Sequence, residues 1–201
     1  MPTPSSKTKL WLLILLTMVA WSPSLRTASW TADDPEVLLQ SPVITGALPL
    51  TEAFTRDYTY HVGGSGQWRP AAALSLRLDH SIHGASSSRG WHLTNILIHL
   101  ATIALAVGLG AKLFEKVPWL GLAFFAVHPI LSDSVAWASG RPSLLCALLG
   151  LTGATLFYRT IANGASKLAT TAASSAALLL PLLAKEDGAL FALLLVFIAP
   201  D

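Results

Sequence analysis

Apolar residues gather into six runs along the chain, at residues 10–28, 92–114, 117–137, 144–161, 168–184 and 188–201. A helix needs ~20 predominantly apolar residues to cross a bilayer, and most of these runs approach that length. The last run stops with the chain, so we expect it to be a truncated helix. The pattern predicts an all-α membrane protein: a polytopic bundle of about six transmembrane helices, with residues 30–91 as one long outer loop.

The third run is the least regular. It carries Pro118 near its start and the pair His128-Pro129 in its second half. Proline removes a backbone donor and restricts the residue before it, so the helix is expected to end or kink at Val127. We therefore expect a short crossing followed by a bent segment at the outer surface.

The first run has two interpretations. The basic start and short apolar core of "KTKLWLLILLTMVAW" are typical of a secretory signal peptide as well as of a retained transmembrane helix. The next segment, "AWSPSLRTASW", is a poor small-residue cleavage site, which favours retention.

Composition supports the membrane interpretation. Hydrophobic residues occupy 53% of the 201 positions and charged residues only 12%, against roughly 25% charged residues in soluble domains. The net charge is +2 and the sequence has no basic run, so no nucleic-acid partner is expected. The single cysteine, Cys146, lies in an apolar run and allows no intrachain disulfide.

Charge differs between the two sides of the expected bundle. If the N-terminus is cytoplasmic, the positive-inside rule is satisfied by the basic residues of the cytoplasmic turns, which are Lys7, Lys9, Lys112, Lys116, Arg159 and Lys167. The same topology sends nine of the eleven acids to the other side, namely Asp33, Asp34, Glu36, Glu52, Asp57, Asp79, Asp133, Glu186 and Asp187. The reactive side chains are therefore expected at the outer face.

The outer loop, residues 30–91, is too rich in Trp, Tyr, Leu and Pro to be a disordered linker, so we expect it to be ordered. Its segment "DPEVLLQSPVI" starts like a helix, with Asp34 as the N-cap. The segment "GQWRPAAALSLRLDHSIHG" predicts a second helix, with Leu74, Leu78 and Ile82 at helical spacing. This second helix is expected to lie in the membrane interface.

Asp33 and Asp34 follow the first apolar run closely. Paired carboxylates at a membrane edge are suited to a general base that acts near the interface. For Asp34 the alternative to a catalytic role is that of N-capping residue for the helix that follows. Both roles are compatible, because neighbouring side chains at a helix start point ~100° apart, and Asp33 is the freer of the two acids.

Two further polar clusters lie at outer turns. The segment "FFAVHPILSDSVAWASGRPSLL" places His128, Asp133 and Arg141 around one turn. A hydrogen bond at a helix end is the plainer role for His128, whereas the Arg141 guanidinium is a natural clamp for a phosphate oxygen. In "LLPLLAKEDGALF", Lys185 and Glu186 form either a simple charged hairpin or, through Lys185, a contact to an anionic lipid headgroup.

His92, Asn95 and His99 form one stripe of the second run. Neither histidine has a cysteine or carboxylate nearby in its own segment, so interhelical hydrogen bonding is favoured over metal binding. No metal site is predicted, and a divalent-metal requirement stays open.

The order of these segments resembles a known family. The apolar helix, "DD", "WRPAAALSLRLDHSIHG", "GWHLTNILIHL", "FFAVHPILSDSVAWASGR" and "LLAKEDGAL" are similar to the successive N-terminal blocks of the transmembrane and tetratricopeptide-repeat protein O-mannosyltransferases and their bacterial relatives. The resemblance covers roughly residues 10–198. Those proteins are similar to the membrane glycosyltransferases of the GT-C fold, so a partial GT-C fold is implied.

This resemblance implies an inverting transfer of a sugar, expected to be mannose, from a polyprenyl-phosphate donor to a Ser/Thr hydroxyl of a protein. The reaction would take place at the periplasmic or lumenal face of a bacterial inner membrane or the endoplasmic reticulum. The catalytic base would be Asp33 or Asp34. The residues expected to bind the donor phosphate or sugar, converging with these acids in one pocket, are Arg69, His128, Asp133, Arg141, Lys185 and Glu186. The implied partners are membrane lipid, the lipid-linked donor and a protein acceptor; no cofactor is identified, and a divalent metal stays open.

The chain departs from the family pattern at two places. Pro142 and Ser143 follow the Gly-Arg pair where the family has an acid nearby, and Leu131 replaces the second histidine of the histidine block. The sugar and the acceptor therefore stay open, and a lipid or glycan acceptor is an alternative. A transporter or passive scaffold is a third interpretation, although transporters usually place their ionisable groups near the midplane.

Overall fold

The computed structural model describes residues 5–26, 29–31 and 33–199. Within these ranges the regular elements are all helices or helical turns, as predicted. They are α1 (Ser6–Trp21), η1 (Ser22–Leu25), η2 (Pro35–Leu39), α2 (Pro42–Thr45), α3 (Glu52–Thr55), η3 (Tyr60–Val62), α4 (Pro70–His83), α5 (Arg89–Leu113), α6 (Trp119–Val127), η4 (Pro129–Leu131), α7 (Ser132–Val135), η5 (Ala138–Gly140), α8 (Arg141–Ala162), α9 (Lys167–Leu182), η6 (Glu186–Leu190) and α10 (Phe191–Ile198).

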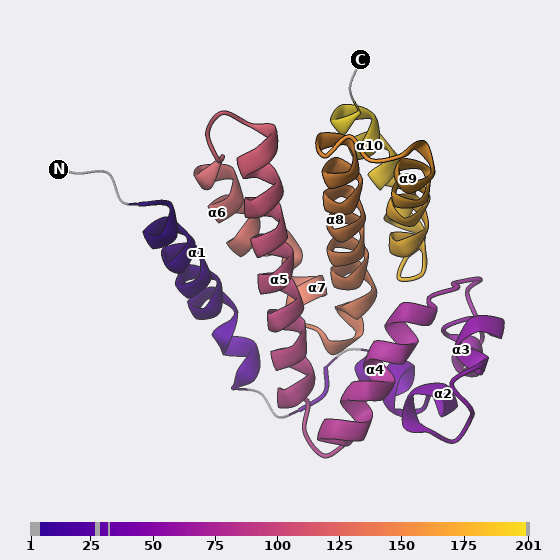
Figure 1. Ribbon diagram of the computed structural model, residues 1–201. Coiled ribbons are helices and arrows are strands. Elements are labelled where there is room, and N and C mark those ends of the chain that lie inside the picture. Colours follow the sequence, from indigo (N-terminus) through magenta and orange to yellow (C-terminus); the bar gives the residue numbers. More distant parts are fainter. Residues whose placement is uncertain (1–4, 27–28, 32, 200–201) are drawn as a thin grey trace.

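The long helices form a bundle, and α2, α3 and α4 lie together at one end of it (Figure 1). Three helical segments of the described residues are long and apolar enough to cross a membrane: Ser6–Leu25, Arg89–Leu113 and Ala138–Ala162. The apolar helix α9 has 16 residues, α6 has 9 and α10 has 8, all below the ~20 that a crossing needs. The predicted number of six crossings is therefore not confirmed.

The basic turns lie at the end of the bundle opposite α2–α4 (Figure 1). That end holds the start of α1, the turn between α5 and α6, and the turn between α8 and α9. Lys112 and Arg159 occupy the last turns of α5 and α8, and Lys167 begins α9. The bundle thus has one basic end. Residues 33–88, here called the cap, lie at the opposite end of the bundle.

The cap is ordered around its own apolar core, as the sequence analysis expects. Its buried residues Leu38, Ile44 and Leu76 pack with Trp91 of α5. The helix predicted in this segment is α4: Pro70 occupies its first turn, and Gly84, at φ +65°, ends it. The predicted stripe on α4 is mostly open, since Leu78 is 59% and Ile82 63% exposed.

The break after α6 falls where the proline predicts it, because α6 ends at Val127. A break in a helix leaves a carbonyl without its helical donor. Here Trp21 Nε1 of α1 donates to Ala126 O at 2.9 Å, and His99 Nε2 of α5 is 3.0 Å from the same oxygen. Three helices therefore meet at one carbonyl, and the interhelical bonding predicted for His99 is confirmed.

Helices α8 and α9 form an antiparallel hairpin in close contact. A Cβ added at Gly153 of α8 would lie 2.4 Å from Ala177 Cα of α9, so only glycine allows this approach. The hairpin brings the start of α8 close to η6, since Lys185 Nζ donates to Ser143 Oγ at 3.2 Å. The turns between α6 and α8 and between α9 and α10, here called the outer turns, therefore lie beside the cap.

Candidate active site

A hollow of about 310 Å³ lies between the cap and the outer turns of the bundle. Its lining residues are Asp33, Val37, Tyr58, Thr59, Gln67, Arg69, Asp133, Trp137, Ser139 and Gly140. Ligand pockets in proteins have volumes of roughly 300–1,000 Å³, so this hollow has room for a small polar group such as a sugar ring. Three residues of the predicted site, Asp33, Arg69 and Asp133, meet here.

The two adjacent acids lie in different environments. Asp33 is exposed and lines the hollow, and its Oδ1 accepts a hydrogen bond from Ser139 Oγ at 3.3 Å. Asp34 is 0% exposed, and its carboxylate accepts from Ser139 N at 2.9 Å and from Thr31 Oγ1 at 3.4 Å. Only Asp33 is placed to meet a substrate.

The capping role predicted for Asp34 is wrong. A capping residue usually has extended backbone, which turns its side chain back toward the free N–H groups of the first turn. Asp34 already has helical backbone, at φ −50° and ψ −47°, and it makes no side-chain capping bond to η2. Its carboxylate is directed to the Ser139 amide instead.

Arg69 is the cation that lines the hollow. Its Nε and Nη2 donate to the two oxygens of Glu186 at 3.2 and 2.6 Å, and its side chain is 12% exposed. The bonds from Arg69 lower the pKa of the Glu186 carboxyl below its usual value. Two of the five guanidinium N–H groups serve Glu186, so Arg69 keeps donors for an anionic ligand. Glu186 thus holds the predicted phosphate-binding group in place.

Arg141 does not line the hollow. Its guanidinium is 0% exposed and pairs with Asp79. It also donates to Asn95 Oδ1, to Ser75 Oγ at 2.8 Å and to Trp91 O at 3.2 Å. Such a set satisfies a buried charge, and it ties α8 to α4 and α5. Arg141 therefore stabilises the packing of α8 against α4 and α5, and it does not line the hollow.

Of the remaining predicted site residues, only Asp133 lines the hollow. Asp133 is exposed and belongs to its lining. Lys185 pairs with Asp187 at 2.8 Å and does not line it. His128 accepts a hydrogen bond from Ile130 N at its Nδ1, the helix-end role that the sequence analysis favours. The expected convergence of all the cations on the acid pair is therefore met by Arg69 alone within the described residues.

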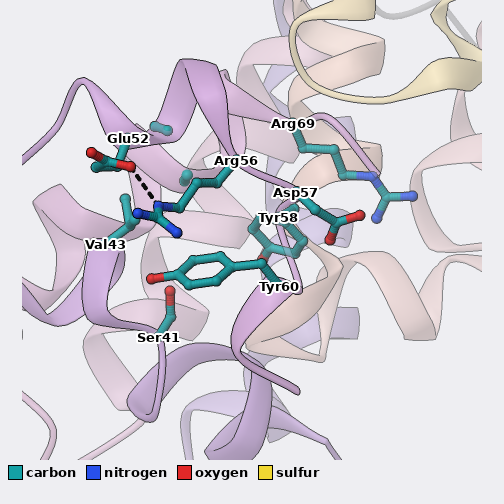
Figure 2. Close-up of a pocket in the computed structure, with 10 residues that line it drawn as sticks. Ser41, Val43, Glu52, Arg56, Asp57, Tyr58, Tyr60 and Arg69 are labelled. Carbon is teal, nitrogen blue, oxygen red and sulfur yellow. Dashed lines mark hydrogen bonds and ion pairs between the residues drawn. The ribbon is translucent and has the colours of Figure 1, made fainter. Parts of the chain in front are cut away.

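A second, smaller hollow lies inside the cap beside Tyr58 (Figure 2). Its volume is about 10 Å³, which is room for about one water molecule, so it is too small for a sugar. Figure 2 shows Asp57 and Arg69 pointing to one side, while Tyr60 and Ser41 lie on the other.

Asp57 organises the loop that carries the lining residue Gln67. Its carboxylate accepts from Thr59 N at 2.7 Å, Thr59 Oγ1 at 2.9 Å, Ser65 N at 3.1 Å and Gln67 N at 2.7 Å. Burial raises the pKa of Asp57, but these bonds together lower it below its ordinary value. The acid thus holds residues 57–67 as a compact loop.

Sequence reasoning missed Tyr58, Gln67 and Ser139. None of them is charged, and each reaches the hollow only because the cap folds against the outer turns. The "SGR" segment that contains Ser139 was noticed for its arginine alone. Within the described residues, no group of three or more His, Cys, Asp or Glu side chains is placed to hold a metal ion.

The fold and the hollow define a helical protein with helices of membrane-spanning length and an acid-lined, arginine-bearing hollow beside one end of the bundle. No family model matches the chain, and no solved structure matches it. The chain is 35% identical over 132 residues to Protein O-mannosyl-transferase Tmtc2 of Drosophila melanogaster, covering 61% of this chain and 14% of that protein.

Two other relatives give the same result. Protein O-mannosyl-transferase F38B6.6 of Caenorhabditis elegans is 30% identical over 128 residues, which is 59% of this chain and 18% of that protein. Protein O-mannosyl-transferase TMTC2 of Homo sapiens is 30% identical over 138 residues, which is 66% of this chain and 15% of that protein. The resemblance stated from the sequence is confirmed, and the chain spans 14–18% of the length of these relatives.

Proposed function

We propose that the chain carries the catalytic base of a membrane glycosyltransferase. This enzyme would move mannose from a polyprenyl-phosphate donor to a Ser/Thr hydroxyl of a protein, with inversion at the anomeric carbon. The observation that carries the proposal is that an exposed carboxylate, Asp33, and the guanidinium-bearing side chain of Arg69 line the same hollow. The names of the relatives support the class of reaction.

The reaction needs two kinds of group. The acceptor oxygen attacks the anomeric carbon while the bond from that carbon to the phosphate oxygen breaks. The acceptor proton passes to the Asp33 carboxylate, a step typically worth 10² to 10⁴ in rate. The leaving polyprenyl phosphate keeps the electron pair, and Arg69 stabilises its charge by hydrogen bonding. One carboxylate is enough, because a phosphate leaves without protonation.

The placement of the hollow fits a lipid-linked donor. The basic turns lie at the far end of the bundle, which by the positive-inside rule supports a cytoplasmic location for that end and a periplasmic or lumenal location for the cap. The polyprenyl chain would then lie in the bilayer while its phosphate and sugar reach the hollow at headgroup level. The GT-C fold and a multi-pass topology belong to this proposal.

The test is replacement of the base in the complete membrane protein. Asp33→Asn keeps the shape of the side chain but removes its basicity, so transfer from radiolabelled dolichyl-phosphate mannose is expected to fall at least 100-fold. Glu36→Gln is the matched control, because Glu36 is an exposed acid three residues further along the same segment and does not line the hollow. Full transfer by a correctly inserted Asp33→Asn protein would contradict the assignment.

The acceptor class needs its own measurement. Mass spectrometry of proteins and lipids from cells with and without the gene would show which molecules carry the additional mannose. Mannosylated Ser or Thr residues are expected. A change confined to glycolipids would replace the protein acceptor by the lipid alternative and leave the proposed role of Asp33 intact.

A further inference from the structure

Ser139 lies between the two acids and binds both. Its backbone N–H donates to Asp34 Oδ1 at 2.9 Å, and its hydroxyl donates to Asp33 Oδ1 at 3.3 Å. The acids belong to the start of the cap, whereas Ser139 belongs to η5, more than a hundred residues later in the chain. One residue of the bundle therefore sets the position of the acid pair.

The turn that carries Ser139 is itself held on two sides. Asn95 Nδ2 of α5 donates to Trp137 O, and Asn95 Oδ1 accepts from Arg141 Nε. On the other side, a Cβ added at Gly140 would lie 2.2 Å from Asp133 O, so the backbone of α7 packs directly against the turn. A turn fixed by a buried charge network and by backbone contact is a rigid support for a reactive side chain.

We propose that Ser139 is the positioning residue of the catalytic base. This inference rests on the proposed function. The amide of Ser139 anchors the buried Asp34 and so fixes the backbone of its neighbour. The hydroxyl holds Oδ1 of Asp33, which leaves Oδ2 to take the acceptor proton. Arg141 acts through this arrangement: its bond to Asn95 keeps the Ser139 turn in place.

The first test removes the hydroxyl alone. In the complete membrane protein, Ser139→Ala is expected to lower kcat for transfer from dolichyl-phosphate mannose by about tenfold, the worth of roughly one hydrogen bond. The KM for the donor and the thermal unfolding temperature stay as in the parent, and Ser139→Thr restores kcat because it supplies the same hydroxyl. Ser81→Ala, which removes an exposed cap hydroxyl that donates to Leu78 O of the same helix, α4, is the control and keeps full activity.

The second test separates the two acids. Asp34→Asn keeps an oxygen that accepts from the Ser139 amide, and its new NH₂ group can donate to Thr31 Oγ1. It is expected to retain about a third of the parent kcat. Asp34→Ala loses the anchor and is expected to fall at least another tenfold. A base cannot be replaced by an amide, so Asp33→Asn shows no such retention.

The outcomes distinguish this inference from the proposed function. If Asp33→Asn is inactive but Ser139→Ala works at the full rate, the positioning role is overturned and the base assignment stands. A raised donor KM at unchanged kcat in Ser139→Ala would also overturn it, since Ser139 would then be a donor-binding residue. Full activity of Asp33→Asn would contradict the proposed function itself.

Discussion

Two polar residues one turn apart on α5 have opposite surroundings. Asn95 is buried, and its amide donates to Ser134 O and Trp137 O and accepts from Arg141. His92 is 1% exposed, and neither of its ring nitrogens has a hydrogen-bond partner within the described residues. Residue type alone therefore says little about what each contributes to stability.

Replacing each by leucine tests this difference. Asn95→Leu leaves the buried Nε of Arg141 and the carbonyl oxygen of Trp137 without their Asn95 partner, so the free energy of unfolding is expected to fall by roughly 3 kcal/mol. His92→Leu removes two unpaired polar atoms and is expected to leave stability equal or higher. Thermal unfolding in detergent measures both. Equal losses in the two variants would contradict this account of α5.

The stability of the cap loop at residues 57–67 is expected to depend on pH through Asp57. Its pKa is lowered from the ordinary value of 3.8, so its stabilisation of residues 57–67 is present above that value and is lost as the pH falls through the lowered one. Hydrogen exchange, corrected for intrinsic rates, is expected to show the Ser65 and Gln67 amides losing protection below about pH 4. In Asp57→Asn, the matched control, this step should vanish.

At the scale of elements, the α8–α9 hairpin depends on one glycine. A methyl group at Gly153 meets the backbone of Ala177, whereas nothing lies within 4 Å of a Cβ at Gly108 of α5. Gly153→Ala is expected to destabilise the protein by about 1–3 kcal/mol through overpacking. Gly108→Ala is expected to be neutral or stabilising by up to ~1 kcal/mol. Thermal unfolding of the two variants measures the difference. Similar shifts of the unfolding temperature in both would contradict the role of Gly153.

Local signals predicted the ends of several elements. The pair His128-Pro129 gave the end of α6 at Val127, because proline acts on the backbone nearby, and the spacing of Leu74, Leu78 and Ile82 gave the helix α4. Asp34 was misjudged because a cap depends on a backbone angle that the sequence does not reveal. The predicted six crossings are not confirmed, since apolar runs do not show how many residues the turns remove from each helix.

At the scale of the whole molecule, the proposed topology predicts which positions face which side of the membrane. Ser65 in the cap and Lys116 in the α5–α6 turn are both exposed. Each is replaced by cysteine in a Cys146→Ala background. An impermeant thiol reagent added to the cap side is expected to label Ser65→Cys only. Labelling of both positions from the same side would contradict the orientation.

The candidate site was predictable only in part. Asp33 was found because a charged residue close after an apolar run stands out in a sequence, and Arg69 through the phosphate-linked donor that the resemblance implies. Arg141 is equally charged, yet it lies inside the protein opposite Asp79, because the cap folds over the start of α8. Contacts between residues 62 positions apart, such as that pair, arise from tertiary packing, and periodicity carries no signal for them.

The shared carbonyl of Ala126 bears on the fate of α1. Trp21 supplies one of the two side-chain contacts to that oxygen, and Leu13 packs with Ile103 beside it. Proteolytic loss of the first helix would strip a donor from a backbone group in apolar surroundings and uncover the residues beneath, at a cost of several kcal/mol. In the described fold α1 therefore belongs to the packed bundle, and the stability of the neighbouring helices depends on its presence.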